Sequence, residues 1–182
     1  KDIKKLTNRF CIMDTTNTVM SSSALVETET QTSIHPLYDK WVLWAHLPHD
    51  TDWSLKSYIK IMDITSLEDL VMIQKSIPEK MVKNCMLFLM KKNINPTWED
   101  PRNINGGCFS FKVSNKSVFN GWNKLLLTLV SNNICRNEKF IKKITGVTIS
   151  PKKTFCIVKI WMESVQFQNT DVLENVDYLN VH

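Results

Sequence analysis

The sequence predicts an α+β fold in which an antiparallel β-sheet carries helices on one face. Strand-length apolar stretches outnumber helical patterns and follow one another in hairpin-like pairs, which favours antiparallel pairing. A parallel, doubly wound sheet would need a helix after nearly every strand, and the helical patterns are too few for that. The 182 residues, 43% of them hydrophobic, fit one domain with a complete core.

The expected elements follow from the periodicity of apolar residues along the chain. Strands are predicted at 41–46, 55–61, 85–90, 108–113, 147–149 and 155–162. A short helix is predicted to begin after an N-cap at Ser66, with Leu67, Leu70 and Val71 on one face. The best helical pattern covers residues 118–130, where apolar residues recur at helical spacing. The residues most simply assigned to the core are Trp41, Trp44 and Trp122.

Residues 1–34 are predicted to form a flexible arm before a single domain at 35–182, because residues 12–33 are rich in Ser and Thr and contain no aromatic. The arm carries four basic and four acidic side chains, so the net charge of +5 lies in the domain. Within the domain, residues 136–159 hold seven basic residues and one acidic residue. Such an excess indicates an anionic partner or a solvated face.

Motifs for catalysis, metals and membranes are missing from the sequence. Four glycines in total exclude a P-loop and a dinucleotide fingerprint, and G-x-S-x-G is absent. Five cysteines without C-x-x-C indicate reduced thiols in a cytosolic or nuclear protein. His46, His49 and Asp50 are too close in a loop around Pro48 to converge on a metal. We expect no enzyme, metal, cofactor, signal peptide or membrane span.

Two tryptophans lie in polar loops that no regular element can bury. Trp53 lies in HDTDWS, and Trp98 lies in NPTWEDP, whose prolines disfavour helix and central strand. A lone loop tryptophan more often covers the core, but here two occur, each beside a carboxylate. Two indoles can stack a nucleobase between them, and they attract a cationic base more strongly.

A carboxylate beside such a sandwich can read the edge of guanine. Glu99 can accept two hydrogen bonds from guanine, and it would be left unpaired and desolvated by adenine or cytosine. The pattern therefore predicts a pocket for cationic guanine, for which 7-methylguanosine of the messenger RNA cap is the natural ligand. Its phosphates would need basic residues, and the candidates are Lys152, Lys153 and Lys159.

The ordered set of motifs resembles the eukaryotic initiation factor 4E family of cap-binding proteins over about residues 35–165. The resemblance rests on His35-Pro36-Leu37, the WVLW strand, Trp53, the PTWEDP loop, Gly106-Gly107, Trp122 and the strand that ends in Trp161. It implies a curved antiparallel sheet with helices on the convex face and a cap-binding slot on the concave face.

The resemblance also implies residue roles. Trp53 and Trp98 would stack the methylated guanine, Glu99 would read its edge, and Trp161 would touch the methyl group. Lys152 stands at a phosphate-binding position. The departures from the family pattern are Thr154, Ile157 and Cys108 in place of basic residues and Met86 in place of an acidic one. Lys153 and Lys159 could compensate, since Lys159 and Trp161 share a strand face.

A helical peptide partner on the convex face is implied as well. His35, Pro36, Leu37 and Leu127 match the family, whereas Val71 replaces a tryptophan and Lys124 replaces an acidic residue. A long helix that the family carries after its last tryptophan strand is reduced here to a shortened segment, DVLENVDYLNVH.

We therefore expect a monomeric protein, cytoplasmic or also nuclear, that recruits capped messenger RNA for translation initiation and takes 7-methyl-GTP as its minimal ligand. Its protein partner would be a scaffold or a repressor. Two alternatives stay open. One is a cap-binding translational repressor that does not engage the usual scaffold, as Val71 and Lys124 suggest. The other is an adaptor with weak cap affinity, as Cys108, Thr154 and Ile157 suggest.

Overall fold

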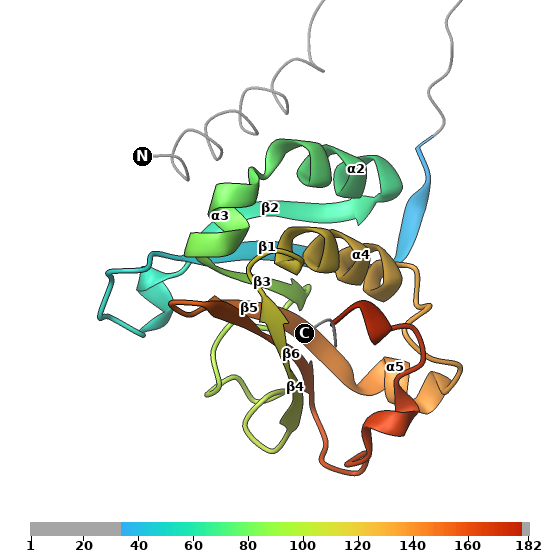
Figure 1. Cartoon of the computed structure of the whole chain (residues 1–182). Coiled ribbons are helices and arrows are strands. Elements are labelled where there is room, and N and C mark those ends of the chain that lie inside the picture. The colour runs from blue at the N-terminus through green and yellow to red at the C-terminus, as the bar shows by residue number, and fades with distance from the viewer. Residues whose placement is uncertain (1–33, 180–182) are drawn as a thin grey trace, which may run out of the picture.

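The computed structural model describes residues 34–179, and a six-stranded sheet forms their centre (Figure 1). The strands lie in the order β2 (Ile59–Ser66), β1 (Pro36–His46), β3 (Met86–Lys91), β5 (Ile144–Pro151), β6 (Phe155–Met162) and β4 (Gly107–Ser114). Every neighbouring pair is antiparallel. The predicted sheet type is therefore confirmed, whereas the predicted arm lies outside the described residues except for Ile34.

Helices cover one face of this sheet, as predicted. They are α2 (Leu67–Ser76), α3 (Glu79–Asn84), α4 (Val118–Val130) and α5 (Glu138–Lys143). Figure 1 shows α2, α3 and α4 in a layer above the strands. The main core lies between the two layers and includes Trp41 and Trp122, both with 0% exposure. No helix among residues 34–179 is long and apolar enough to cross a bilayer.

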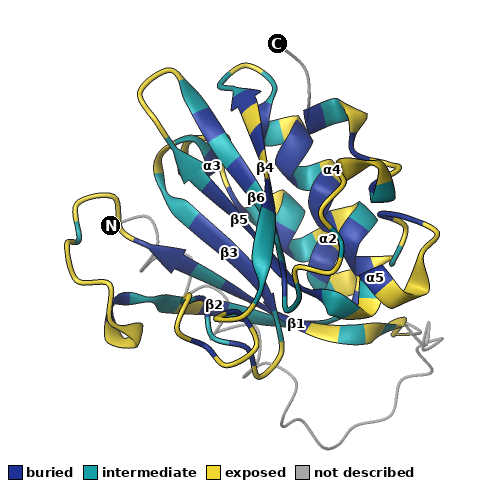
Figure 2. Cartoon of the chain, turned by 90° about the horizontal axis from the view of Figure 1, so that it is seen from below, coloured by how far each residue is buried: buried dark blue, intermediate teal, exposed yellow. Residues whose placement is uncertain are grey.

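The opposite side of the sheet, called the open face below, is only partly covered. Figure 2 views the molecule from below, where β3 and β5 are mostly buried and β6 alternates between half-buried and buried residues. Trp44 is half-buried and packs on this face against Phe88, Met90 and Ile94 in a small second cluster. Trp44, predicted as a core residue, thus packs half-buried against this second cluster and not in the main core with Trp41, because alternate strand residues point to opposite faces.

Several elements match their predicted bounds, and others differ. Helix 118–130 and strand 155–162 are confirmed. Ser66 caps α2 in a capping box with Asp69. The predicted strand 55–61 is wrong at its start, since residues Leu55–Ser57 form a 3₁₀ turn, η1. The helices α3 and α5 were not predicted, because six residues give too little periodicity to detect.

Helix α2 presents a different face to the core from the predicted one. Leu70 and Ile73 are buried, whereas Leu67 and Val71 are 40% and 45% exposed. A capping box fixes where a helix starts but not how it is rotated against the sheet. Leu67 and Val71 therefore belong to the outer surface.

The segment after β6 returns to the helical layer. Over residues 163–179 it forms two short 3₁₀ turns, η2 (Thr170–Val172) and η3 (Asp177–Leu179). Leu179 is buried against Gly121 of α4. A Cβ added at Gly121 would stand 3.7 Å from the Leu179 side chain. The Tyr178 hydroxyl donates to Thr128 Oγ1 at 3.4 Å. This segment therefore closes one end of the main core.

Candidate functional site

Trp53 stands on the loop between β1 and β2 and rests on a buried histidine. Its indole is parallel to the His46 ring, with centroids 4.2 Å apart and an interplanar angle of 2°. His46 is 1% exposed, whereas Trp53 is 55% exposed. Tyr58 contacts the same histidine edge-on at 5.1 Å. One face of the Trp53 indole is thus covered by protein, and much of the residue stays open to solvent.

Trp98 stands on the loop between β3 and β4 and contacts the tryptophan of β6. The Trp98 and Trp161 centroids are 5.7 Å apart, with the rings tilted by 58°. Trp98 is 44% exposed, and Trp161 is half-buried on the open face. The Trp161 Nε1–H donates to Thr148 Oγ1 at 3.2 Å, which fixes the orientation of that indole. Trp98 and Trp161, which the sequence singled out separately, therefore form one aromatic corner.

A buried carboxylate and a buried amide shape the loop that presents Trp98 and Glu99. Asp100, 6% exposed, accepts from the backbone N–H of Asn95 at 2.8 Å and of Arg102 at 2.9 Å. Asn103, 1% exposed, donates to the carbonyl of Thr97 at 2.8 Å and to that of Asn95 at 3.2 Å. The backbone polar groups are satisfied inside the loop, so Trp98 and Glu99 can project outward. Neither Asp100 nor Asn103 was predicted from the sequence as part of the site.

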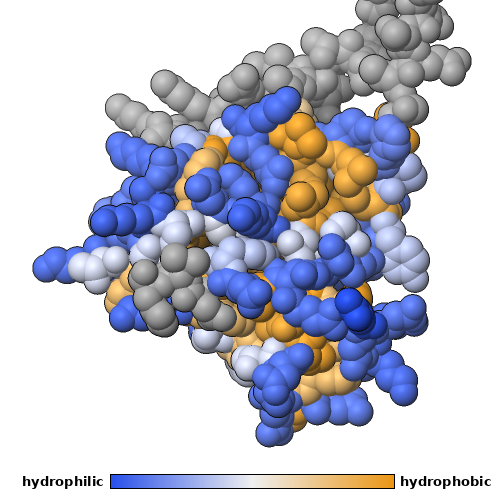
Figure 3. Space-filling view, turned by 45° about the vertical axis from the view of Figure 1, so that its right-hand side comes forward, coloured by the Kyte–Doolittle hydropathy of each residue, from blue (hydrophilic) through white to orange (hydrophobic). Residues whose placement is uncertain are grey.

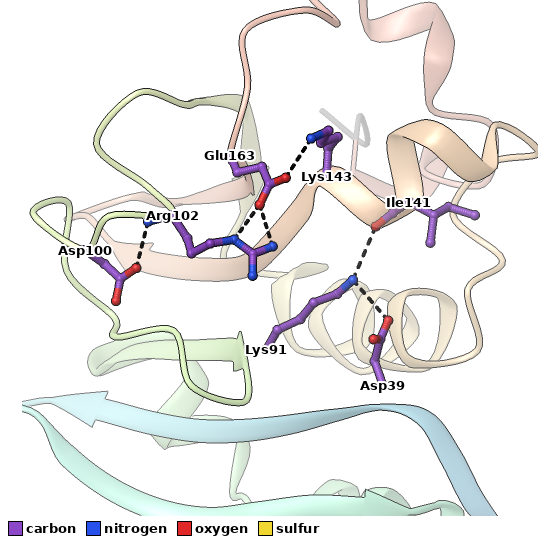
Figure 4. A network of polar contacts seen from close by, with 7 residues as sticks. All are labelled: Asp39, Lys91, Asp100, Arg102, Ile141, Lys143 and Glu163. Carbon is purple, nitrogen blue, oxygen red and sulfur yellow. Dashed lines mark hydrogen bonds and ion pairs between the residues drawn. The ribbon is translucent and has the colours of Figure 1, made fainter.

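The far end of this loop is tied to β6. Arg102 pairs with Glu163, which also accepts from Lys143 Nζ at 2.8 Å, so one carboxylate joins the loop to the end of α5 (Figure 4). Burial raises the pKa of Glu163, but the hydrogen bonds from Lys143 and Arg102 outweigh it, and the pKa is lowered overall.

The last residue of the loop lies directly against β6. At Gly106, a Cβ would stand 1.8 Å from the Met162 carbonyl oxygen, so only glycine fits.

Tyr58 connects the two tryptophan loops. Burial raises the pKa of Tyr58, and the negative charge of Glu99 raises it further. Tyr58 in turn contacts His46, on which Trp53 is stacked. The predicted residues thus fall into two contacting groups: Trp98 touches Trp161, and Trp53 stacks on His46, which Tyr58 also contacts.

A line of basic residues leads away from the aromatic corner along β6. Lys159 pairs with Thr148 and Ser110 in the sheet and shares the open face with Trp161, as strand alternation predicted. Lys112 of β4 lies on the same face, with its Nζ 4.8 Å from the Phe155 ring centroid. Lys112 was not predicted as a site residue, although the alternation of its strand places it on this face.

Lys152 and Lys153 are exposed beside the turn that joins β5 to β6, at the far end of this line. The Lys152 backbone N–H donates to the Phe155 carbonyl at 2.8 Å and so closes the turn. Cys108 shares the face of Trp161 and Lys159, and its Sγ is 3.8 Å from Ser110 Oγ. A thiol and a hydroxyl thus stand side by side on the open face of β4.

The basic run at 136–159 does not form one patch. Strand β5 carries the chain from one end of the sheet to the other, so its first and last lysines separate. At the first end, a hollow of about 800 Å³ is lined by Lys91, Arg102 and Arg136 among others. Acids pair with these cations: Asp39 with Lys91 at 3.0 Å, and Glu174 with Arg136 at 3.2 Å. Figure 4 shows Lys91 between Asp39 and the carbonyl of Ile141.

A second hollow, of about 590 Å³, lies on the outer side of α2 and is lined by His35, Leu67, Glu68, Val71, Met72, Lys75 and Ser76. Apolar surface gathers in the upper part of the face shown in Figure 3. Leu127 of α4 is 51% exposed. Leu37 instead packs against the main core, and Pro36 pairs with Ser66 in the sheet.

An ion pair joins the first residue of the predicted domain to α2. His35 Nδ1 lies 2.7 Å from Glu68 Oε1, and the His35 backbone N–H donates to Glu68 Oε2 at 3.1 Å. The hydrogen bond from the His35 side chain is the largest of the contacts that lower the pKa of Glu68 to about 2. The motif His35-Pro36-Leu37 therefore positions the entry of β1 against the helix.

Across residues 34–179, no group of three or more His, Cys, Asp or Glu side chains is placed to hold a metal ion. The His46 Nε2 instead lies 2.8 Å from the carbonyl oxygen of Asp52. His49 is exposed in the loop. His46 therefore belongs to the support of Trp53.

Comparisons of sequence show what this chain is similar to. A family model described as eukaryotic initiation factor 4E matches residues 36–178. The eukaryotic translation initiation factor 4E of Eremothecium gossypii is 31% identical over 139 residues, which are 72% of this chain and 64% of that protein. The factor of Saccharomyces cerevisiae is 27% identical over 170 residues, covering 88% of this chain and 76% of that protein. The chain thus spans less than two thirds of the first of these relatives.

Solved structures share the fold. The schistosome eIF4E complexed with m7GpppG and 4E-BP has a TM-score of 0.68 at 23% identity, over 76% of this chain and 77% of that one. The Caenorhabditis elegans eIF4E-3, in a complex with the 4E-binding protein Mextli and a cap analog, has a TM-score of 0.67 at 20% identity, over 76% and 80%. At these identities the likeness supports the architecture of the sheet and its helices.

Proposed function

The chain belongs to the eukaryotic initiation factor 4E family, and we propose that it binds the 7-methylguanosine cap of messenger RNA between Trp53 and Trp98. The proposed role is non-enzymatic: the protein recruits capped messenger RNA for translation initiation. The binding unit is the domain at 35–182, and the cytoplasm is the proposed site of action.

The observation that carries this proposal is the way the loop at 92–106 presents Trp98 and Glu99. Asp100 and Asn103 are buried to hold the loop, and the two outward residues are an indole and a carboxylate. A site for an apolar ligand would not need the carboxylate, and a lid over the core would not leave Trp98 44% exposed. A flat cation with paired N–H donors at its edge suits both groups.

Trp161 and the basic residues suit the remainder of the ligand. Trp161 stands 5.7 Å from Trp98, where it borders a base stacked on the indole. From there, Lys159 and Lys112 share the open face, and Lys152 and Lys153 stand at the end of β6. We propose that the phosphates run along β6 toward this turn. Lys112 and Lys159 would then supply charge that Cys108, Thr154 and Ile157 do not.

The proposed protein partner is a helical peptide from a scaffold or a repressor, bound over α2 and α4. Both solved relatives described above are complexes with 4E-binding proteins. On this chain, Val71 and Leu127 are exposed, and the hollow beside His35 and Glu68 is partly apolar. Leu67 and Val71 line that hollow with exposed apolar surface, which indicates an interaction surface.

A cap-binding repressor is the second candidate function. Its support is Val71 on the outer side of α2, where a smaller side chain offers less contact area than a tryptophan, the kind of residue that dominates interfaces. Affinity for a peptide from the scaffold, compared with affinity for one from a repressor, distinguishes the two roles.

Calorimetric titration tests the cap proposal directly. We expect 7-methyl-GTP to bind at least about tenfold more tightly than GTP, because only the methylated base is cationic. Glu99→Gln should weaken both ligands, since an amide accepts only at one of its two polar atoms. Glu138→Gln, which changes an exposed carboxylate on α5, serves as the matched control. Equal affinity of the wild type for the two nucleotides would refute the proposal.

A further inference from the structure

We propose that His46 is a positioning residue for Trp53 and that its charge state sets the affinity for a cationic base. This inference rests on the proposed function, because the base must stack on Trp53. It begins from an unusual placement: a histidine that is 1% exposed lies parallel under a tryptophan that is 55% exposed.

His46 connects the loop of Trp53 to the sheet. Within residues 47–58, the backbone hydrogen bonds run between near neighbours, as from Asp50 N–H to Leu47 O at 3.2 Å. The side chains of Asp50 and Asp52 likewise accept from groups two residues ahead. His46 is the last residue of β1, and it contacts the loop twice, through the Trp53 ring and the Asp52 carbonyl. The ring therefore fixes where the indole stands before a ligand arrives.

The hydrogen bond to Asp52 is compatible with both charge states of the imidazole. A carbonyl oxygen only accepts, so His46 Nε2 carries the proton, and in the neutral ring Nδ1 is then unprotonated. Protonation at Nδ1 would leave the stack and the Nε2 bond in place and add a positive charge beneath the indole. The geometry can thus stay constant while the charge changes.

That charge opposes a ligand which is itself cationic. The indole attracts a cation to its face through its ring quadrupole, and an imidazolium under one face repels a methylated guanine on the other. Unmethylated guanine is neutral and is affected less. We therefore expect acid to weaken the binding of 7-methyl-GTP more than that of GTP across the range in which histidine changes charge, about pH 8 to about pH 5.5.

Other charged groups lie around the same ring, and their effects on binding must be distinguished from the effect of His46. Asp52 and Asp50 lie on the loop, and Tyr58, the residue before β2, contacts the ring and is itself influenced by the charge of Glu99. Hydrogen bonds from the backbone and hydroxyl of Ser54 lower the pKa of Asp52, and the charge of His46 adds to this, so Asp52 stays ionised over the range tested. The titrations of these groups and of the ligand are common to wild type and variant.

The experiment compares wild type with His46→Phe, which keeps an aromatic ring under Trp53 but cannot titrate. Dissociation constants for 7-methyl-GTP and GTP are measured from about pH 8 to about pH 5.5. His46→Phe is expected to bind several-fold more weakly at high pH, because the bond to Asp52 is lost. As pH falls, Coulomb repulsion across the indole should weaken the wild type but not His46→Phe. The dissociation constant of His46→Phe for 7-methyl-GTP, divided by that of wild type, should therefore fall by about 3- to 30-fold from the high-pH end to the low-pH end.

His49→Phe is the matched control, because His49 is an exposed histidine of the same loop. It should keep the pH dependence of the wild type. A constant ratio for His46→Phe, or an equal loss in His49→Phe, would overturn the inference. If wild type fails to distinguish the two nucleotides even at high pH, the proposed function has failed instead.

A ligand-free measurement tests whether His46 becomes charged beneath Trp53. The difference in fluorescence between wild type and Trp53→Phe isolates the Trp53 signal, and a charged imidazole stacked on the indole should quench it as pH falls. The same difference taken in the His46→Phe background should stay flat. A flat signal in both backgrounds would show that His46 is not charged beneath Trp53, and the inference would fall.

Discussion

Asn103 donates from its side-chain amide to the carbonyl of Thr97 at 2.8 Å, so a residue that is 1% exposed fixes the backbone immediately before Trp98. This contact joins two separate parts of the loop at 92–106. It explains how an exposed indole can keep a defined orientation without packing into the core. The affinity of the site should therefore depend on buried residues that never touch the ligand.

Replacing Asn103 with alanine should weaken binding of 7-methyl-GTP by about 1–2 kcal/mol. The variant removes the bonds to Thr97 and Asn95, and each such bond contributes about 0.5–1.5 kcal/mol. Calorimetric titration measures the loss, and Asn105→Ala, an exposed asparagine of the same loop, is the control. Equal affinities in the two variants would show that the loop does not depend on Asn103.

Trp98→Ala should cost about 2–4 kcal/mol in binding of 7-methyl-GTP, because it removes both stacking and cation–π attraction. Trp98→Phe should recover part of the loss, since a smaller ring still stacks. Circular dichroism should show both variants folded, because Trp98 is 44% exposed and lies outside the main core. If Trp98→Ala bound as tightly as wild type, the assignment of Trp98 to the pocket would be wrong.

Gly106→Ala should destabilise the protein by about 1–3 kcal/mol, the usual cost of forcing an extra methyl group into packed structure. Its Cβ would stand 1.8 Å from the Met162 carbonyl oxygen, so the loop must move away from β6. Gly107→Ala is the matched control, since its nearest atom would be Val165 Cγ1 at 3.5 Å. Urea denaturation of the two variants measures the difference, and equal midpoints would contradict the close approach.

Lys112→Ala and Lys159→Ala should each reduce the salt dependence of binding to a capped RNA oligonucleotide. Each lost phosphate contact lowers the slope of log K against log salt by about 0.7. Lys116→Ala, which changes an exposed lysine in the turn after β4, should leave the slope unchanged. A slope in Lys112→Ala equal to that of wild type would remove Lys112 from the phosphate path.

The bond between His35 and Glu68 should make stability depend on pH in acid. The pKa of Glu68 falls from 4.5 to about 2 in the folded protein, so its contribution is complete above the higher value and is lost as pH drops toward the lower one. The difference in free energy of unfolding between wild type and Glu68→Gln should therefore shrink over this window. Urea denaturation measures it, and a difference that grew in acid would contradict the pairing.

Regular elements with strong periodicity were predictable from the sequence. Helix 118–130 and strand 155–162 have their predicted bounds, because seven of the thirteen residues of α4 are buried and β6 alternates without interruption. The aromatic corner was predictable in part: the sequence marked Trp98 and Trp161, but only the fold shows that they touch.

The support of the site was not predictable, because it depends on contacts that the fold creates. Asp100 and Asn103 look like ordinary loop residues until the loop closes around them. His46 was read only as a weak metal candidate, since its stacking partner is seven positions away around a turn. The division of the basic run at 136–159 was not predictable either, because it depends on β5, which separates Lys143 from Lys152 by the length of a strand.

The most direct test of the central claim is tryptophan fluorescence during titration with 7-methyl-GTP, with GTP as the comparison. Stacking on Trp53 and Trp98 predicts strong, saturable quenching by the methylated nucleotide and much weaker quenching by GTP at the same concentrations. An equal response to both, or no response to either, would contradict a pocket for the cationic guanine.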